Sequence, residues 1–149
     1  MKVKEELYKT CEIFVENRLK NLQQSMNDIQ KAMLSETKSS AGDKHEIGRA
    51  MLQLEREQLG VQLLEIQKVK EALYQIDVSK PSQLACSGSV VFTTQANYFI
   101  AISAGEITFE NNTFYAISPH TPIGQLLISQ KVNDKIVFRD QKFKITKVI

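Results

Sequence analysis

The segment that most constrains the fold of this chain is residues 2–33, which contain no Gly and no Pro. Apolar residues recur there at steps of four and three, which lines them along one side of a helix as a narrow coiled-coil seam. The seam residues are Val15, Leu19, Leu22, Met26, Ile29 and Met33, and Val3, Leu7, Cys11 and Phe14 or Val15 extend it upstream. The pattern predicts a long helix that packs against one partner helix.

A second helix is predicted from about residue 44 to about residue 76. The residues before it, 35–43, are small and polar and include Gly42, which breaks a helix. Asp43, followed three residues later by Glu46, fits a capping box at the start of the new helix. Its predicted seam is Ile47, Met51 and Leu54, then, after a one-step phase shift, Leu59, Leu63, Ile66, Val69, Leu73 and Ile76.

The two predicted helices have similar lengths and a short connection, which favours an antiparallel hairpin within one chain. A coiled coil between several chains is the alternative. The hairpin is assigned to residues 1–77, with an acidic tip near residues 39–46. We expect a monomer.

After the hairpin the pattern changes to that of a small β-rich domain. Pro81 and the polar residues around it mark a linker, assigned to residues 78–87. Residues 88–149 alternate β-branched and aromatic residues in five or six short stretches, with one short helix at residues 122–129. Tight turns are expected at Asn111-Asn112 and Asp140-Gln141. The fold class is therefore α+β, a long helical hairpin followed by a sheet domain.

Bulk composition excludes several classes of protein. The net charge of +2 is too small to argue for nucleic-acid binding by itself. Cys11 and Cys86 are far apart in different predicted elements, and neither has zinc-ligand spacing, so we expect no disulfide and no zinc site. The N-terminal residues do not resemble a signal peptide, and no apolar run approaches the length of a membrane span, so the cytoplasm is the expected compartment.

Four short motifs in order along the chain resemble the Gre family of RNA polymerase transcript-cleavage factors. Residues 42–46, Gly-Asp-Lys-His-Glu, are similar to the family's Gly-Asp-x-x-Glu tip. Residues 76–80 resemble its junction between hairpin and globular domain. Residues 117–127 resemble its Ser-Pro-Ile-(small)-x-x-Leu element, and residues 131–138 its Lys-x-Gly-Asp-x-Val strand entry. The resemblance covers nearly the whole chain and implies a bacterial protein with an FKBP-like second domain.

The resemblance also implies a function. The protein would be no enzyme itself, but would bind RNA polymerase, insert its hairpin into the secondary channel and stimulate cleavage of backtracked RNA, acting on the RNA 3′ end indirectly. Asp43 and Glu46 would be the catalytic pair and would share Mg²⁺ with the polymerase active site, since the chain has no cofactor of its own. Ser118, Pro119, Pro122 and Ile123 would be the docking surface. Helix capping alone is the other interpretation of the acidic pair.

The tip departs from the family after the acidic pair. The family continues Asn-Ala-Glu-Tyr, whereas this chain has Ile47, Gly48, Arg49 and Ala50. The departure favours an alternative, a channel-binding modulator or inhibitor of the polymerase without cleavage activity. A further alternative is an FKBP-like isomerase or chaperone, which would need a concave aromatic pocket in the second domain.

Overall fold

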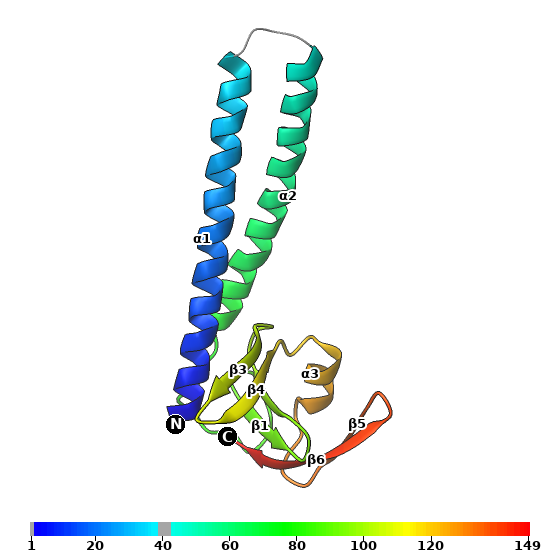
Figure 1. The fold of residues 1–149 in the computed structure, drawn as a ribbon. Helices are drawn as coiled ribbons and strands as arrows, with labels where there is room; N and C mark the ends of the chain where they lie inside the picture. The colour runs from blue at the N-terminus through cyan, green and yellow to red at the C-terminus, as the bar shows by residue number, and fades with distance from the viewer. Residues whose placement is uncertain (1, 39–42) are drawn as a thin grey trace. The chain divides into compact units, whose positions relative to one another are not determined.

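The predicted α+β architecture is confirmed by a computed structural model, which describes the backbone of residues 2–38 and 43–149 and the side chains of residues 2–36 and 46–149. Two long helices come first, followed by strands and one short helix (Figure 1). The elements are α1 (Lys2–Lys38), α2 (Asp43–Tyr74), β1 (Val90–Thr93), β2 (Asn97–Ile100), β3 (Gly105–Phe109), β4 (Asn112–Ile117), α3 (Pro122–Leu127), β5 (Lys135–Phe138) and β6 (Gln141–Val148).

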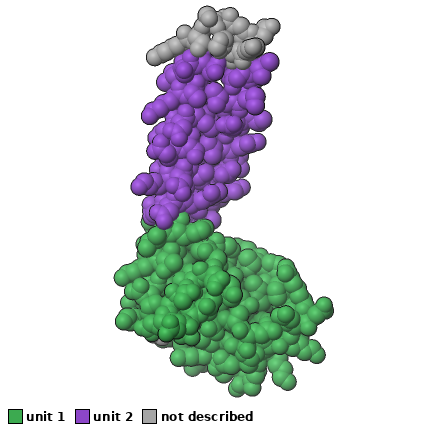
Figure 2. Space-filling model, viewed as in Figure 1, with its two compact units in different colours: residues 1–14, 71–149 green, residues 15–70 purple. Residues whose placement is uncertain are grey.

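The chain forms two compact units, coloured separately in Figure 2. Unit 1 contains residues 1–14 and 71–149, and unit 2 contains residues 15–70. The first turns of α1 and the last residues of α2 therefore belong with the sheet.

Unit 2 is an antiparallel pair of helices whose α1 side follows the predicted seam. Val15, Leu19, Leu22 and Ile29 are buried, and Met26 and Met33 are half-buried. Polar contacts flank the seam: Lys70 Nζ lies 3.0 Å from Glu16 Oε1, and Arg18 Nη2 donates to Gln62 Oε1 at 3.3 Å. These exposed contacts contribute little to stability, so the apolar seam holds the hairpin together.

On α2 the prediction was wrong near the tip. Ile47, Met51 and Leu54 are all more than half exposed, and Leu52 is turned inward instead. The predicted five-residue step from Leu54 to Leu59 would rotate the apolar face by about 140° at 100° per residue. An uninterrupted helix can turn only one of these two faces towards α1. The face that contains Leu59 therefore continues to pack against α1 up to the tip.

At the other end of α1, in unit 1, a lysine takes a core position. Lys4 is 1% exposed, whereas Val3, which was predicted for the stripe, is half-buried. The Lys4 ammonium donates to the Lys80 carbonyl at 3.1 Å, and burial lowers the pKa of Lys4. Leu7, Cys11 and Leu73 are fully buried in the same unit.

Tyr8 joins the two helices within unit 1. Its hydroxyl donates to the Leu73 carbonyl at 2.9 Å, near the end of α2. Burial raises the pKa of the Tyr8 phenol, so the hydroxyl remains a donor at neutral pH. The same carbonyl accepts from Ile76 N–H at 3.1 Å, so Tyr8 adds a second bond at this helix end.

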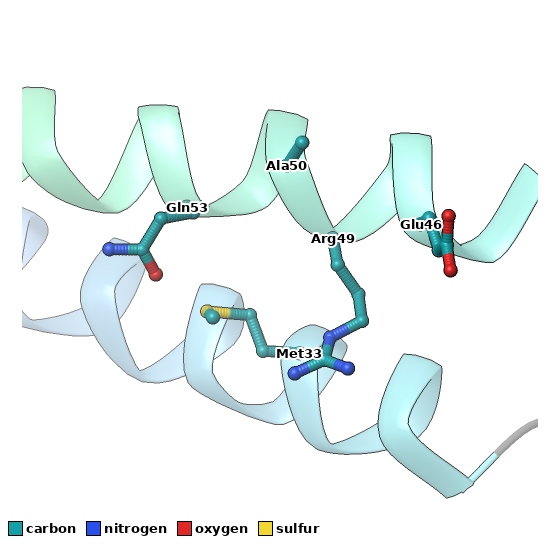
Figure 3. Close-up of a pocket in the computed structure, with 5 residues that line it drawn as sticks. All are labelled: Met33, Glu46, Arg49, Ala50 and Gln53. Carbon is teal, nitrogen blue, oxygen red and sulfur yellow. The ribbon is translucent and has the colours of Figure 1, made fainter. Parts of the chain in front are cut away.

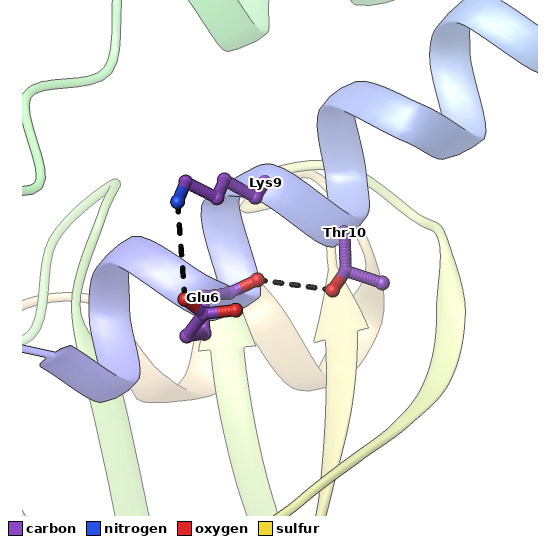
Figure 4. Close-up of polar contacts among 3 residues, drawn as sticks. All are labelled: Glu6, Lys9 and Thr10. Carbon is purple, nitrogen blue, oxygen red and sulfur yellow. Dashed lines mark hydrogen bonds and ion pairs between the residues drawn. The ribbon is translucent and has the colours of Figure 1, made fainter.

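The outer side of α1 in this unit carries only local contacts. Figure 4 shows Lys9 Nζ at 3.9 Å from Glu6 Oε1, one turn away, and Thr10 Oγ1 donating to the Glu6 carbonyl at 2.9 Å. Such exposed pairs contribute at most about 0.5 kcal/mol each. This side of the helix is a solvated surface.

The sheet has six strands in the order β3-β4-β2-β1-β6-β5. All neighbours are antiparallel except β2 and β4, which pair in parallel with Asn97 opposite Phe114. Two parallel strands cannot be joined by a tight hairpin turn. After β2 the chain runs back along β3 and then enters β4, which lies between β3 and β2 in the sheet. A bulge interrupts the β1–β6 pairing between Phe92 and Thr93.

Both hairpin turns lie one residue earlier than predicted. Positive φ values occur at Glu110 and Asn111, with Phe109 paired to Asn112. The same arrangement recurs at Arg139 and Asp140, with Phe138 paired to Gln141. Two consecutive left-handed residues are typical of the type I′ turn that matches strand twist.

The core on one face of the sheet is closed by α3. Its buried members are Ala85, Val91, Ile100, Ile123, Leu127, Ile136, Phe143 and Ile145. The segment predicted as a linker contributes to this core: Ala85 N–H donates to the Gln130 carbonyl at 2.8 Å, and Ser129 N–H donates to the Ala85 carbonyl at 2.7 Å. Residues around Ala85 are therefore fixed to the sheet domain.

Candidate functional site

The hairpin tip lies between the end of α1 at Lys38 and the start of α2 at Asp43. Asp43 is the first residue of α2, but its side chain, like that of His45, lies outside the described side chains. The Glu46 side chain is described and is exposed one turn into α2. A carboxylate in the first turn of a helix is favoured by the N–H groups of that turn.

Glu46 borders a shallow cleft between the two helices of unit 2. The cleft has a volume of about 330 Å³ and is lined by Met33, Glu46, Arg49, Ala50 and Gln53. In Figure 3, Arg49 and Gln53 extend from α2 towards α1, where Met33 lies, while the Glu46 carboxylate stays beside α2. One acidic, one basic and one amide group therefore share the mouth of the cleft.

Two small residues of α2, Gly48 and Ala50, lie at the level of this cleft. A Cβ added at Gly48 would lie 3.5 Å from the Glu36 carboxylate carbon, which is ordinary van der Waals contact. Gly48 thus faces α1, and the neighbouring Ala50 is also small.

Glu46 is the carboxylate of the predicted pair whose side chain is described, and it could supply one ligand to a metal held by a partner. Carboxylate oxygens are the ligands that Mg²⁺ prefers, and one or two protein carboxylates suffice when a partner supplies the rest. Among the described side chains, those of residues 2–36 and 46–149, no cluster of three or more His, Cys, Asp or Glu residues could hold a metal ion. Glu46 is exposed and so is accessible to a metal held by a partner.

The predicted docking residues surround the start of α3. Pro122 is exposed, Ser118 and Pro119 are half-buried, and Ile123 is only 8% exposed within the core. A partner can therefore reach the first three directly, whereas Ile123 holds α3 against the sheet.

The backbone at this point is held by a compact set of hydrogen bonds. Thr121 is the N-cap of α3, and its Oγ1 accepts from Gly124 N–H at 3.1 Å and donates to the Ser118 carbonyl at 2.7 Å. His120 N–H donates to Ser118 Oγ at 3.1 Å. The bonds fix the turn that presents Pro119 and Pro122.

A second cleft of about 600 Å³ lies in unit 1 between residues 82–87 and the α3 region. Its lining residues are Ser82, Leu84, Ala85, Cys86, Ser87, Pro119, His120, Gln125, Ile128 and Ser129. None of them is Phe, Tyr or Trp, so this cleft lacks the aromatic lining predicted for a prolyl isomerase pocket. His120 lies at its edge with an exposed side chain.

From the sequence, Arg49 was identified as a departure from a family pattern and as one of several basic residues on the helices, and its position beside Glu46 was missed. The i, i+3 spacing of Glu46 and Arg49 was the available signal, because such residues lie on the same side of a helix. Lys4 was missed because lysine is almost never fully buried unless its ammonium group finds a partner.

No protein-family description matches this sequence, and no curated protein matches it. In the described ranges, none of the helices combines the length and apolar character needed to cross a bilayer.

Proposed function

We propose that this protein binds RNA polymerase and inserts its helical hairpin into the secondary channel, so that the tip reaches the active site and stimulates cleavage of backtracked RNA. The observation that carries the proposal is a hairpin of two helices longer than 30 residues, joined to a small sheet domain, with exposed Glu46 beside the turn. At 1.5 Å per residue, α1 is about 55 Å long, which suits delivery of a side chain into a deep channel.

Asp43 and Glu46 would together hold Mg²⁺ jointly with carboxylates of the polymerase. A metal bound there supplies charge stabilisation to the attacking or leaving oxygen of the phosphodiester. The sheet domain would dock at the channel rim through Ser118, Pro119 and Pro122. The polymerase would remain the catalyst, and the protein would act in the bacterial cytoplasm.

The test is RNA shortening in stalled, backtracked elongation complexes. Wild type should shorten the RNA in the presence of Mg²⁺, and Asp43→Ala with Glu46→Ala should reduce shortening to the rate of polymerase alone while still binding polymerase. Glu55→Ala with Glu57→Ala removes two exposed acids from the same helix and serves as the matched control, which should retain full stimulation. Cleavage by the tip variant at the wild-type rate would show the catalytic assignment to be wrong.

A second function, modulation of the polymerase without cleavage, is favoured by Arg49. Its guanidinium group extends across the same cleft that Glu46 borders, and a cation beside a carboxylate opposes metal binding. In that case wild type binds polymerase and alters nucleotide addition but leaves backtracked RNA intact. Replacing Arg49 with Glu, the residue of the family pattern at that place, should then increase shortening.

A further inference from the structure

Four lysines of β5 and β6, the last two strands of the chain, lie on one face of the sheet. Lys135 on β5 is directly opposite Lys144 on β6, and Lys142 is opposite Val137. The residues between them, Ile136 and Phe143, are buried in the core beneath α3. Because side chains alternate between the faces of a sheet, the three lysines point away from that core.

The bulge adds the fourth lysine to this face. Val91 pairs with Val148, and both pack with the core, so the next pair, Phe92 and Lys147, lies on the opposite face. In a regular strand Lys147 would share the face of Phe143 and Ile145. The extra residue in β6 reverses this, and Lys147 Nζ lies 5.6 Å from the Phe92 ring centre.

All four lysines are exposed, and no acidic side chain among the described residues pairs with them. Like charges directly opposite each other destabilise a sheet. Lysines also protect edge strands from aggregation, and β6 pairs with β5 over residues 141–144 and with β1 over residues 145–148. Edge protection does not explain Lys144, which lies opposite Lys135 of β5 on one side and whose carbonyl accepts from Thr94 N–H at 3.0 Å on the other.

The charge is local. Residues 131–149 contain six basic and two acidic residues, a net +4, whereas the whole chain carries +2, so residues 1–130 carry −2. A charge asymmetry of this kind is typical of a surface that binds a polyanion.

We infer that this lysine face, Lys135, Lys142, Lys144 and Lys147, binds the phosphate backbone of single-stranded nucleic acid. Protein–protein interfaces are depleted in Lys and use apolar and aromatic residues as anchors. Among the described residues of the lysine face, Val137 is the one large apolar side chain that is exposed, so the face does not have the composition of a protein interface. Sites for single strands combine lysines that follow the backbone with a nearby aromatic ring, as Phe92 is here. The inference does not depend on the proposed action at the polymerase.

The test uses the full chain and a fluorescein-labelled 20-nucleotide oligouridylate, with fluorescence anisotropy between 50 and 200 mM KCl. Lys135→Gln, Lys142→Gln and Lys144→Gln together should weaken binding about tenfold or more at 50 mM and should lower the log–log salt slope by about 2, at about 0.7 per phosphate contact on a single strand. Removal of like-charge repulsion should leave the Tm equal to or above that of wild type.

The matched control is Lys20→Gln, Lys31→Gln and Lys68→Gln, which removes the same charge from exposed helix positions and should leave binding unchanged. If this control loses binding equally, the effect depends on the net charge of the protein and not on the lysine face, and the inference is overturned. The inference also fails if wild type does not bind, if polyglutamate competes as well as the oligonucleotide, or if duplex DNA binds more tightly. No polymerase is present, so failure here leaves the proposed function standing.

Discussion

Gly124 shows how a single residue controls the geometry of the α3 region. A Cβ placed there would lie 2.4 Å from the Ser118 carbonyl oxygen and 2.9 Å from Thr121 Oγ1. Both atoms belong to the N-cap arrangement that presents Pro119 and Pro122. The motif resemblance included a small residue at this position, and the packing gives the physical reason for it.

Gly124→Ala should therefore destabilise the sheet domain by about 1–3 kcal/mol, because backbone must shift to admit the methyl group. Gly60→Ala is the control, since nothing lies within 4 Å of its Cβ position in α2, and it should stabilise by about 0.5–1 kcal/mol. Denaturant unfolding measures both. A neutral Gly124→Ala would contradict the close contact with Ser118.

The two cysteines should differ in reactivity. Cys11 is fully buried, which raises the pKa of its thiol to about 12, whereas Cys86 is exposed. The thiolate is the reactive form, and a raised pKa keeps Cys11 protonated until the pH approaches 12. At pH 8, a disulfide reagent such as DTNB should modify one thiol in the folded protein and two in guanidinium chloride. Two rapid equivalents under native conditions would contradict the burial of Cys11.

At the scale of elements, α2 has two apolar faces near the tip, and only one of them packs against α1. The sequence alone could not choose between them, because Ile47, Met51 and Leu54 have seam spacing of their own. The choice follows from the rest of the helix, where Ile66 and Leu73 are buried and fix the phase. The α1 seam was predicted correctly because it offers a single stripe from Val15 to Met33.

Leu52→Ala and Leu54→Ala compare the two faces with the same substitution two residues apart. Leu52 is half-buried, so Leu52→Ala should lower the stability of the hairpin by about 1–2 kcal/mol. Leu54 is 56% exposed, so Leu54→Ala should lower it by less than about 0.5 kcal/mol. Thermal unfolding followed by the helical circular dichroism signal measures both. A larger loss for Leu54→Ala would support the seam first predicted from the sequence.

The strands of the sheet were located from alternation and turn residues, but finer features were not. Both type I′ turns lie one residue early because Glu110 and Arg139 adopt left-handed conformations, which their residue types do not signal. The β1–β6 bulge has no marker in the sequence, so the face of Lys147 could not be predicted. Long-range pairing determines such positions.

For the molecule as a whole, periodicity and breakers predicted a hairpin followed by a sheet domain. They did not predict that residues 1–14 belong with the sheet unit, where Lys4 and Tyr8 bond to the distant carbonyls of Lys80 and Leu73. For the candidate site, the motif located Glu46, and the structure adds Arg49 beside it. The lysine face combines residues whose shared orientation only the sheet register reveals.

If the hairpin enters the secondary channel as proposed, its tip reaches the polymerase active site. A photocrosslinker on Glu46→Cys, in a Cys86→Ser background, tests it directly in backtracked elongation complexes with labelled RNA. We expect crosslinking from position 46 to the RNA 3′ end, and none from the same group on Glu57→Cys, about 16 Å farther along α2. Absence of a crosslink from position 46, or equal crosslinking from both positions, would contradict it.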